Sequence, residues 1–357
     1  MRPARQTSQR RPRQTARPAV GLPAALLAGL AVLVLASCST SKERAETAPS
    51  SCNGAAGLCE RRLNEVVFAG THNSMAASDE PGWSFANQRY GISRQLDDGI
   101  RALLIDVHFG VYDAATGRVR TDLSAEGSDR NKVAKQVPPL ALRLADRVAG
   151  RVGVGTLSGK PALYLCHTLC ELGAEPLERE LEVIRDFLDR HPHQVLIVIV
   201  EDYVPPASIE RSFEQAGLMH YVATLERGQP PPTLGALIAR GQRLMVFAEE
   251  KGGTPAWYMP AFSFIQDTPL GATRPDQLSC KRYRGEQHSP LLLINHWIPP
   301  FPPSPSLNAA IGREAFLRTR IKRCLAQDGA KGAIVAVDFY QRTSVVKVAR
   351  ELDGEGG

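Results

Sequence analysis

Beyond its first 37 residues, this sequence of 357 residues has no net charge. The leader contains six Arg and no acidic residue, which leaves 37 of the 43 basic residues against all 37 acidic ones. A neutral body does not attract a polyanion, so we expect no nucleic-acid partner. The formal charge of +6 belongs to the leader and not to the part that is expected to fold.

Three further absences narrow the class of protein. No apolar run after the leader reaches membrane-spanning length, so we expect the remainder to lie outside the membrane. No glycine-rich fingerprint follows the first expected strand, which disfavours a dinucleotide-binding fold. No paired CxxC motif occurs and the His residues lie elsewhere, which disfavours a structural zinc site.

The leader, residues 1–37, has the three parts of an export signal: an Arg-rich start, an apolar run and a few small residues. It runs into Leu-Ala-Ser-Cys, which resembles a bacterial lipobox with Cys38 as the lipidated first residue of the mature chain. We therefore expect an exported lipoprotein in the cell envelope or at the extracellular face, with residues 38–51 as a flexible tether. An uncleaved membrane anchor is the alternative, because the apolar run comes near spanning length.

Seven Cys occur, and one of them is used at the lipobox. An even remainder in an exported chain indicates disulfides. Nearness in sequence, and then elimination, favours three pairs: Cys52–Cys59, Cys166–Cys170 and Cys280–Cys324.

Short apolar runs rich in Val, Ile, Leu and Phe alternate with helix-like segments. Near-continuous apolar runs are typical of parallel strands that are covered on both faces. The runs fall at 65–70, 102–107, 162–166, 195–200, 244–248, 262–265, 291–295 and 333–339. Eight strands and amphipathic helices such as 176–192 predict an α/β fold, an irregular single-domain (β/α)8 (TIM) barrel over residues 52–350, rather than an open doubly wound sheet. Residues 351–357 are predicted to be a disordered tail.

Polar side chains follow most of these runs, at the end where the loops of a barrel converge on one mouth. In chain order they are His72, Asn73, Asp106, His108, His167, Glu201, Asp202, Glu249, Asn295, His296 and Asp338. A lone His is more often structural than catalytic, but burying several His and carboxylates together without a use costs desolvation. Two His on opposite sides of a mouth suit proton removal and proton delivery, and nearby oxygen ligands suit a cation that neutralises a phosphate. The pattern indicates phosphodiester cleavage.

At these residues the sequence resembles the phosphatidylinositol-specific phospholipase C X-domain superfamily of phosphodiesterases. The similar segments, in the family's order, are GTHNSM, QLDDGIRALLIDVHFG, LYLCHTLCELG, FLDRHPHQVLIVIVEDYV, TLGALIARGQRLMVFAE and AIVAVDFY. The sequence CNGAAGLCERRLNEVVFAGTHNSM, which contains the first segment and the two Cys before it, resembles the secreted branch of the family in bacteria, fungi and plants.

The resemblance implies that His72 is the general base and His167 the general acid. It also implies that Asn73, Asp106 and Glu201 are calcium ligands. His108 departs from the family, which has a further carboxylate or an Arg at that position. Imidazole is a poor calcium ligand, so His108 is expected to bind phosphate or the site to take a softer metal.

Further polar residues at the strand ends are assigned to the same site. We interpret Asn295 and His296 as further phosphate-binding or substrate-binding residues. Asp202 is assigned to the same group, although for Asp202 and Asp338 we favour bracing a loop or holding a His in its tautomer over direct chemistry. An ion pair with a neighbouring basic residue is the structural alternative for Glu201.

The sequence thus predicts a monomeric, lipid-anchored phosphodiesterase that acts on a phospholipid or another phosphodiester, and Ca²⁺ is the cofactor that its expected oxygen ligands would suit. A glycerophosphodiesterase or a sphingomyelinase D-like enzyme on the same barrel is the first alternative. A non-catalytic surface lipoprotein that binds a ligand is the second.

Overall fold

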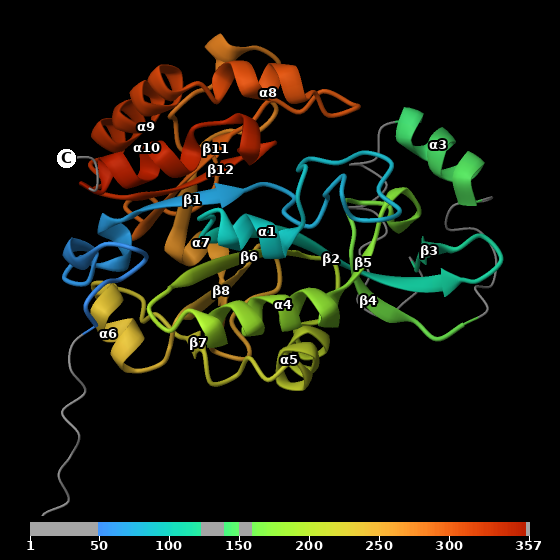
Figure 1. Ribbon diagram of the computed structural model, residues 1–357, viewed down its shortest axis with the longest axis horizontal. Coiled ribbons are helices and arrows are strands. Elements are labelled where there is room, and N and C mark those ends of the chain that lie inside the picture. Colours follow the sequence, from blue (N-terminus) through green and yellow to red (C-terminus); the bar gives the residue numbers. More distant parts are fainter. Residues whose placement is uncertain (1–48, 123–138, 150–158, 355–357) are drawn as a thin grey trace, which may run out of the picture. The chain divides into compact units, whose positions relative to one another are not determined.

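The computed structural model describes residues 49–122, 139–149 and 159–354. Their centre is a curled sheet (Figure 1), and eight of its nine parallel strands form the barrel. In spatial order these strands are β10 (Ile265–Asp267), β11 (Leu291–His296), β12 (Ala333–Val337), β1 (Val67–Thr71), β2 (Ala102–Asp113), β6 (Leu196–Asp202), β8 (Leu244–Ala248) and β9 (Tyr258–Pro260). Among the described residues no ladder joins β9 to β10, so the barrel is open at that seam. The α/β fold and the irregular (β/α)8 barrel are confirmed.

Each strand contributes to two apolar layers because successive side chains point to opposite faces. In β2, Ala102 and Leu104 point into the barrel interior, whereas Leu103 and Ile105 belong to the layer beneath the helices. Strands that are buried on both faces explain the near-continuous apolar runs of the sequence.

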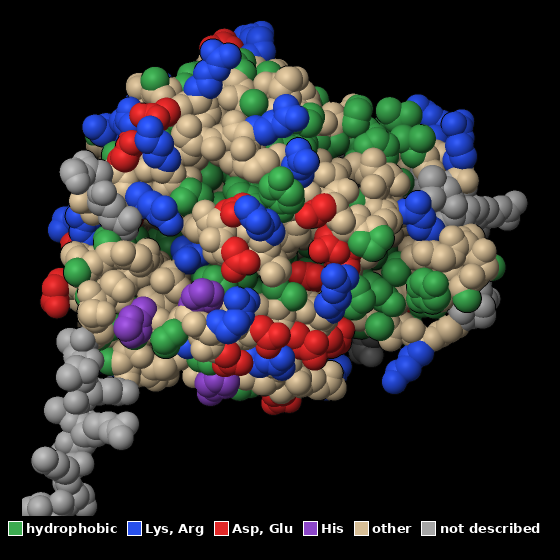
Figure 2. Space-filling view, viewed as in Figure 1, with side chains coloured by type: hydrophobic (Ala, Val, Ile, Leu, Met, Phe, Trp, Pro, Cys, Tyr) green, Lys and Arg blue, Asp and Glu red, His purple; other side chains and the backbone are tan. Residues whose placement is uncertain are grey.

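Amphipathic helices cover the outer layer. The helix α4 (Leu177–Arg190) buries Leu181, Ile184 and Leu188 against it, and charged side chains gather over α4 on the exposed face in Figure 2. The other helices are α1 (Ile92–Asp97), α3 (Pro139–Ala149), α5 (Pro206–Gln215), α6 (Leu234–Ala239), α7 (Ala261–Phe264), α8 (Pro305–Ile311), α9 (Glu314–Asp328) and α10 (Val345–Leu352). No helix in the described part of the chain is long and apolar enough to cross a membrane.

Two predicted barrel strands are wrong. The run at 162–166 forms β4 (Ala162–Leu165), which pairs antiparallel with the long outer end of β2. There it lies near β3 (Arg118–Thr121) and β5 (Glu175–Pro176), outside the parallel ring. The run at 262–265 is mostly α7, and β9 and β10 flank it. A four-residue apolar run does not reveal the direction of its partner strand, which explains the first error.

The ends of the folded part also differ from the prediction. Residues 351–354, which were predicted to belong to a disordered tail, are part of the described structure: α10 continues to Leu352, and the Asp353 carboxylate accepts a hydrogen bond from the Val67 N–H at 3.0 Å. The export signal, Cys38 and most of the tether lie outside the described residues. A short strand, β7 (Val222–Ala223), completes the sheet beside β8.

All three predicted disulfides are present. Cys52–Cys59 closes a turn before β1, Cys166–Cys170 closes the loop after β4, and Cys280–Cys324 joins a loop to α9. Disulfides persist in oxidising compartments, which agrees with export.

Candidate active site

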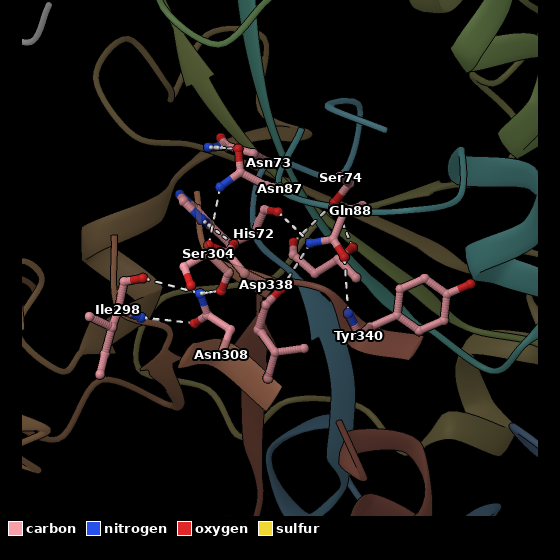
Figure 3. Close-up of polar contacts among 12 residues, drawn as sticks. His72, Asn73, Ser74, Asn87, Gln88, Ile298, Ser304, Asn308, Asp338 and Tyr340 are labelled. Atoms are coloured by element: carbon pink, nitrogen blue, oxygen red, sulfur yellow. Dashed lines mark hydrogen bonds and ion pairs between the residues drawn. The ribbon is translucent and has the colours of Figure 1, made fainter. Parts of the chain in front are cut away.

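His72 is the first residue after β1, and its backbone is fixed from two sides. Its N–H donates to the Val337 carbonyl of the neighbouring strand at 3.0 Å. The fully buried Gln88 amide donates to the carbonyls of His72 at 2.8 Å and of Val337 at 3.0 Å (Figure 3). Gln88 therefore holds the ends of β1 and β12 together at the mouth of the barrel.

A chain of hydrogen bonds orients the His72 ring. Its Nδ1 lies 2.8 Å from Oδ1 of Asp338, and the other carboxylate oxygen of Asp338 accepts from Asn87 at 3.1 Å. Asn87 in turn accepts from the Asn73 amide at 3.3 Å (Figure 3). Because a carboxylate is an acceptor, the proton of neutral His72 belongs on Nδ1, and Nε2 is left as the basic nitrogen.

His167 stands in a small loop that three contacts hold. The Cys166–Cys170 disulfide closes the loop around it. The Thr121 hydroxyl accepts from the Cys170 N–H at 2.9 Å and donates to the buried Glu171 carboxylate at 2.7 Å. The strand before His167 is not a barrel strand. These contacts nevertheless fix the loop so that His167 reaches the mouth of the barrel from outside the parallel strands.

The two imidazoles face the same space. Their ring centroids lie 6.3 Å apart and their planes make an angle of 78°. The His167 ring is exposed along the cavity, yet the protein atoms around it and the nearby His72 lower its pKa to about 4. Two imidazoles so close disfavour a second positive charge, which suits a pair in which one ring is protonated and the other is neutral.

Two chambers meet at His72. The first, which we call the apolar chamber, has a volume of about 310 Å³ and contains both His72 and His167. The second, which we call the polar chamber, has a volume of about 350 Å³. His72, Leu270 and Trp297 border both. Other residues of the apolar chamber include Trp83, Phe85, Leu169, Leu172 and Phe301. Those of the polar chamber include Asp106, Glu201, Glu249, Glu250, Arg284 and Asn295.

The predicted calcium ligands are only partly brought together. Asp106 and Glu201 are register partners on β2 and β6 and border the polar chamber. Asn73 is buried, and its amide nitrogen is turned towards Asn87. Within residues 49–122, 139–149 and 159–354, no three His, Cys, Asp or Glu side chains form a group that could hold a metal ion.

Calcium binding by Asn73, Asp106 and Glu201 stays a prediction. Rates measured in EGTA and again after addition of calcium test it, and equal rates would contradict it.

Three predicted phosphate-binding residues do not border either chamber. His108 is 2% exposed and stacks on Tyr203 with ring centroids 4.0 Å apart. The Asp202 carboxylate accepts the backbone N–H groups of Glu250 at 2.9 Å and Lys251 at 3.0 Å, so it braces the loop after β8. This placement gives no support to phosphate binding by either residue.

His296 is the third of these residues. It is buried, with Nε2 3.1 Å from the Ile311 carbonyl and Nδ1 3.0 Å from the Arg320 guanidinium. Burial and Arg320 lower its pKa to about 3, so it is a neutral structural residue. Asn295 does border the polar chamber, and its amide donates to Asp267 at 3.1 Å.

Four residues of the site were not predicted: Asn87, Gln88, Arg284 and Trp297. Asn87 and Gln88 lie in a loop without periodicity, and only the folded chain shows that they reach β12. Arg284 lies in the polar chamber and pairs with Asp267 at 2.6 Å and Glu249 at 2.7 Å. Among these four residues, only Trp297 could have been found from the sequence, because it directly follows His296, a predicted site residue at the end of a strand.

The chain is similar to several known proteins. A family model described as PI-PLC X matches residues 155–353. The PI-PLC X domain-containing protein 1 of Arthroderma benhamiae is 25% identical over 85% of this chain and 89% of its own length. An uncharacterized secreted protein of the same fungus is 26% identical over 66% of this chain and 43% of its own length. Among solved structures, the phosphatidylinositol-specific phospholipase C from Listeria monocytogenes is 16% identical and covers 83% of this chain and 97% of its own, with a TM-score of 0.46.

Proposed function

This chain belongs to the PI-PLC X family, and we propose that it is a phosphodiesterase that works by general acid–base catalysis. The observation that carries the proposal is the pair of imidazoles, His72 and His167, which come from separate loops and lie 6.3 Å apart in one cavity. A single phosphate between them could exchange one proton with each ring. The Asp338 carboxylate, which is bound to Nδ1 of His72, orients the ring as a general base requires.

In the proposed reaction, Nε2 of His72 takes the proton of an attacking hydroxyl. The oxygen of that hydroxyl forms a bond to phosphorus, and the bond from phosphorus to the leaving oxygen breaks. His167 gives its proton to the leaving oxygen, which departs as an alcohol. When the hydroxyl belongs to the head group, the other product is a cyclic phosphodiester.

His167 must carry a proton to act as the acid, although its surroundings and His72 lower its pKa in the ligand-free protein. A bound phosphodiester anion reverses this preference, because a nearby negative charge stabilises the imidazolium. Substrate binding therefore prepares the acid.

The two chambers support an amphiphilic substrate. Aromatic and aliphatic side chains such as Trp83, Leu172 and Phe301 surround the space beside His167. Carboxylate, amide and guanidinium groups surround the space on the other side of His72. We propose that the apolar chamber receives the leaving group of a phospholipid or a similar ester and that the polar chamber receives its head group.

The three disulfides and the secreted relative support an extracellular location for the folded part. Attachment to a membrane through lipidated Cys38 and a monomeric state are part of the proposal. Mass spectrometry of the mature N-terminus would test the lipid anchor, and an N-terminal peptide without an acylated Cys38 would contradict it.

A panel of phosphodiesters analysed by phosphorus NMR tests the activity. A cyclic inositol phosphate indicates internal attack, whereas release of choline or glycerol indicates the alternative phosphodiesterases on the same fold. We expect His72→Gln and His167→Gln each to lower kcat by a factor of about 100 or more. His193→Gln is the matched control, since His193 precedes β6 at the opposite end of the barrel. Unchanged rates in both cavity variants would exclude the mechanism, and no turnover of any ester would favour a ligand-binding protein.

A further inference from the structure

The indole of Trp297 lies flat against the imidazole of His72. The ring centroids are 3.9 Å apart and the planes differ by 6°. Trp297 directly follows β11, and only 7% of it is exposed. The contact joins a residue after β11 to a residue after β1, two strands that are separated in the sheet by β12.

Both chain neighbours of Trp297 are held in place. On one side, the buried His296 ring is fixed between the Ile311 carbonyl and Arg320. On the other side, the side chain of Asn308 accepts the Ile298 N–H at 3.0 Å and donates to the Ile298 carbonyl at 3.1 Å (Figure 3). A backbone fixed on both sides leaves the indole little freedom to move away from His72.

We propose that Trp297 is a positioning residue that sets the plane of the His72 ring; this inference rests on the proposed function, in which His72 is the base. The bond to Asp338 fixes one atom of the imidazole but allows the ring to rotate about the line from Nδ1 to the carboxylate. Face-to-face contact with a rigid indole removes that rotation. Together the two contacts aim Nε2 at one point in the cavity.

Trp297 has two further effects on the same ring. A cation over the face of an indole is attracted to its π system, so Trp297 stabilises the imidazolium that forms when His72 takes a proton. Trp297 and His72 also stand together between the apolar and polar chambers. The base is thereby held at the boundary, where the phosphate of an amphiphilic ester would lie.

Three variants test the positioning role by activity. We expect Trp297→Leu, which loses the flat aromatic face, to lower kcat by about tenfold or more, because small misplacements of a catalytic group are costly. Trp297→Phe keeps a flat face and should recover most of that loss. Trp257→Phe is the matched control: Trp257 is also 7% exposed, but it packs against Phe213 and Tyr258 in the core. A Trp297→Leu protein that melts like Trp297→Phe and keeps its kcat within about twofold of the wild type would overturn the proposal.

A second readout does not depend on turnover and separates this inference from the proposed function. A protonated imidazole quenches the fluorescence of an indole on which it stacks. We expect tryptophan emission of the wild type to fall as His72 is protonated on acidification. This component should be absent from both His72→Gln and Trp297→Phe and should persist in Trp257→Phe. A component that survives in Trp297→Phe would refute the stacking even if the protein is an active phosphodiesterase, and its loss would support the stacking even if no substrate is cleaved.

Discussion

His72 and Asp338 are 266 residues apart in sequence, yet Nδ1 of the first lies 2.8 Å from the carboxylate of the second. Strand register explains the contact. Thr71 and Val337 are partners in the parallel ladder of β1 and β12, so the residues that follow them emerge side by side. Phe339 then adopts a left-handed backbone conformation with φ 49°, which ends the strand, and its N–H donates to the Asn87 carbonyl at 2.7 Å.

Asp338→Asn should leave the fold intact and lower kcat at least about 100-fold. An amide can still accept a hydrogen bond from Nδ1, but it carries no charge to stabilise the imidazolium that forms on proton transfer. It can also turn its NH₂ group to the ring and favour the wrong tautomer. Steady-state rates at saturating substrate measure the effect.

Asp353→Asn is the control for this substitution, because Asp353 is also a buried carboxylate but binds the Val67 N–H at the start of β1. It should cost stability and leave kcat unchanged. Equal rates for Asp338→Asn and the wild type would show that the carboxylate does not support His72.

The pH profiles should show that substrate changes the protonation of His167. The protein atoms around the ring and the nearby His72 lower its pKa in the free protein, and a phosphate anion would raise that pKa in the complex. Because an acid must be protonated, activity falls as pH rises through the pKa of His167. Since kcat/KM reports the free protein and kcat the complex, we expect the alkaline limb of kcat at a higher pH than that of kcat/KM. Coincident limbs would mean that bound phosphate does not influence this ring.

The parallel barrel was predictable because its strands are buried on both faces and therefore consist of nearly unbroken apolar runs. β1, β6 and β12 begin and end within a few residues of their predicted positions. The sequence could not show that β2 continues to Asp113 and pairs with β4, since pairing direction depends on distant segments. His167 was nevertheless placed correctly relative to His72, because its loop returns to the same mouth.

The sequence did not predict those side chains of the site whose role depends on contact with a distant segment of the chain. Asn87 and Gln88 have the composition of an ordinary loop, and only contact with Asp338 and His72 gives them a role. Trp297 is an aromatic residue at a strand end, which is compatible with simple packing. Conversely, His296 satisfied the rule of polar residues at strand ends, but its ring turns away and binds Ile311 and Arg320.

Removing the Cys166–Cys170 disulfide should lower kcat, whereas removing a disulfide far from the cavity should not. This disulfide spans four residues and closes the loop that carries His167, so its loss loosens the aim of the acid. We expect the double variant Cys166→Ser/Cys170→Ser to lose about tenfold or more in kcat. Cys52→Ser/Cys59→Ser removes another short disulfide, one that spans seven residues outside both chambers, and should keep its kcat. Equal losses in the two double variants would show a general effect on folding instead of a local one on His167.

Buried His296 should make the protein less stable in acid. Its pKa falls from 6.5 to about 3 on folding, because burial and Arg320 disfavour the imidazolium. Between those values the unfolded chain binds a proton that the folded chain does not, so stability decreases as pH falls below about 6.5, by roughly 1 kcal/mol per pH unit for this one group. His296→Gln lacks this proton, so the difference in unfolding free energy between wild type and variant should shrink steadily from pH 6.5 to 4.5 and stay constant above pH 7. Urea unfolding with the disulfides intact measures both curves, and parallel curves over the whole range would mean that His296 is protonated as easily in the folded protein as in the unfolded chain.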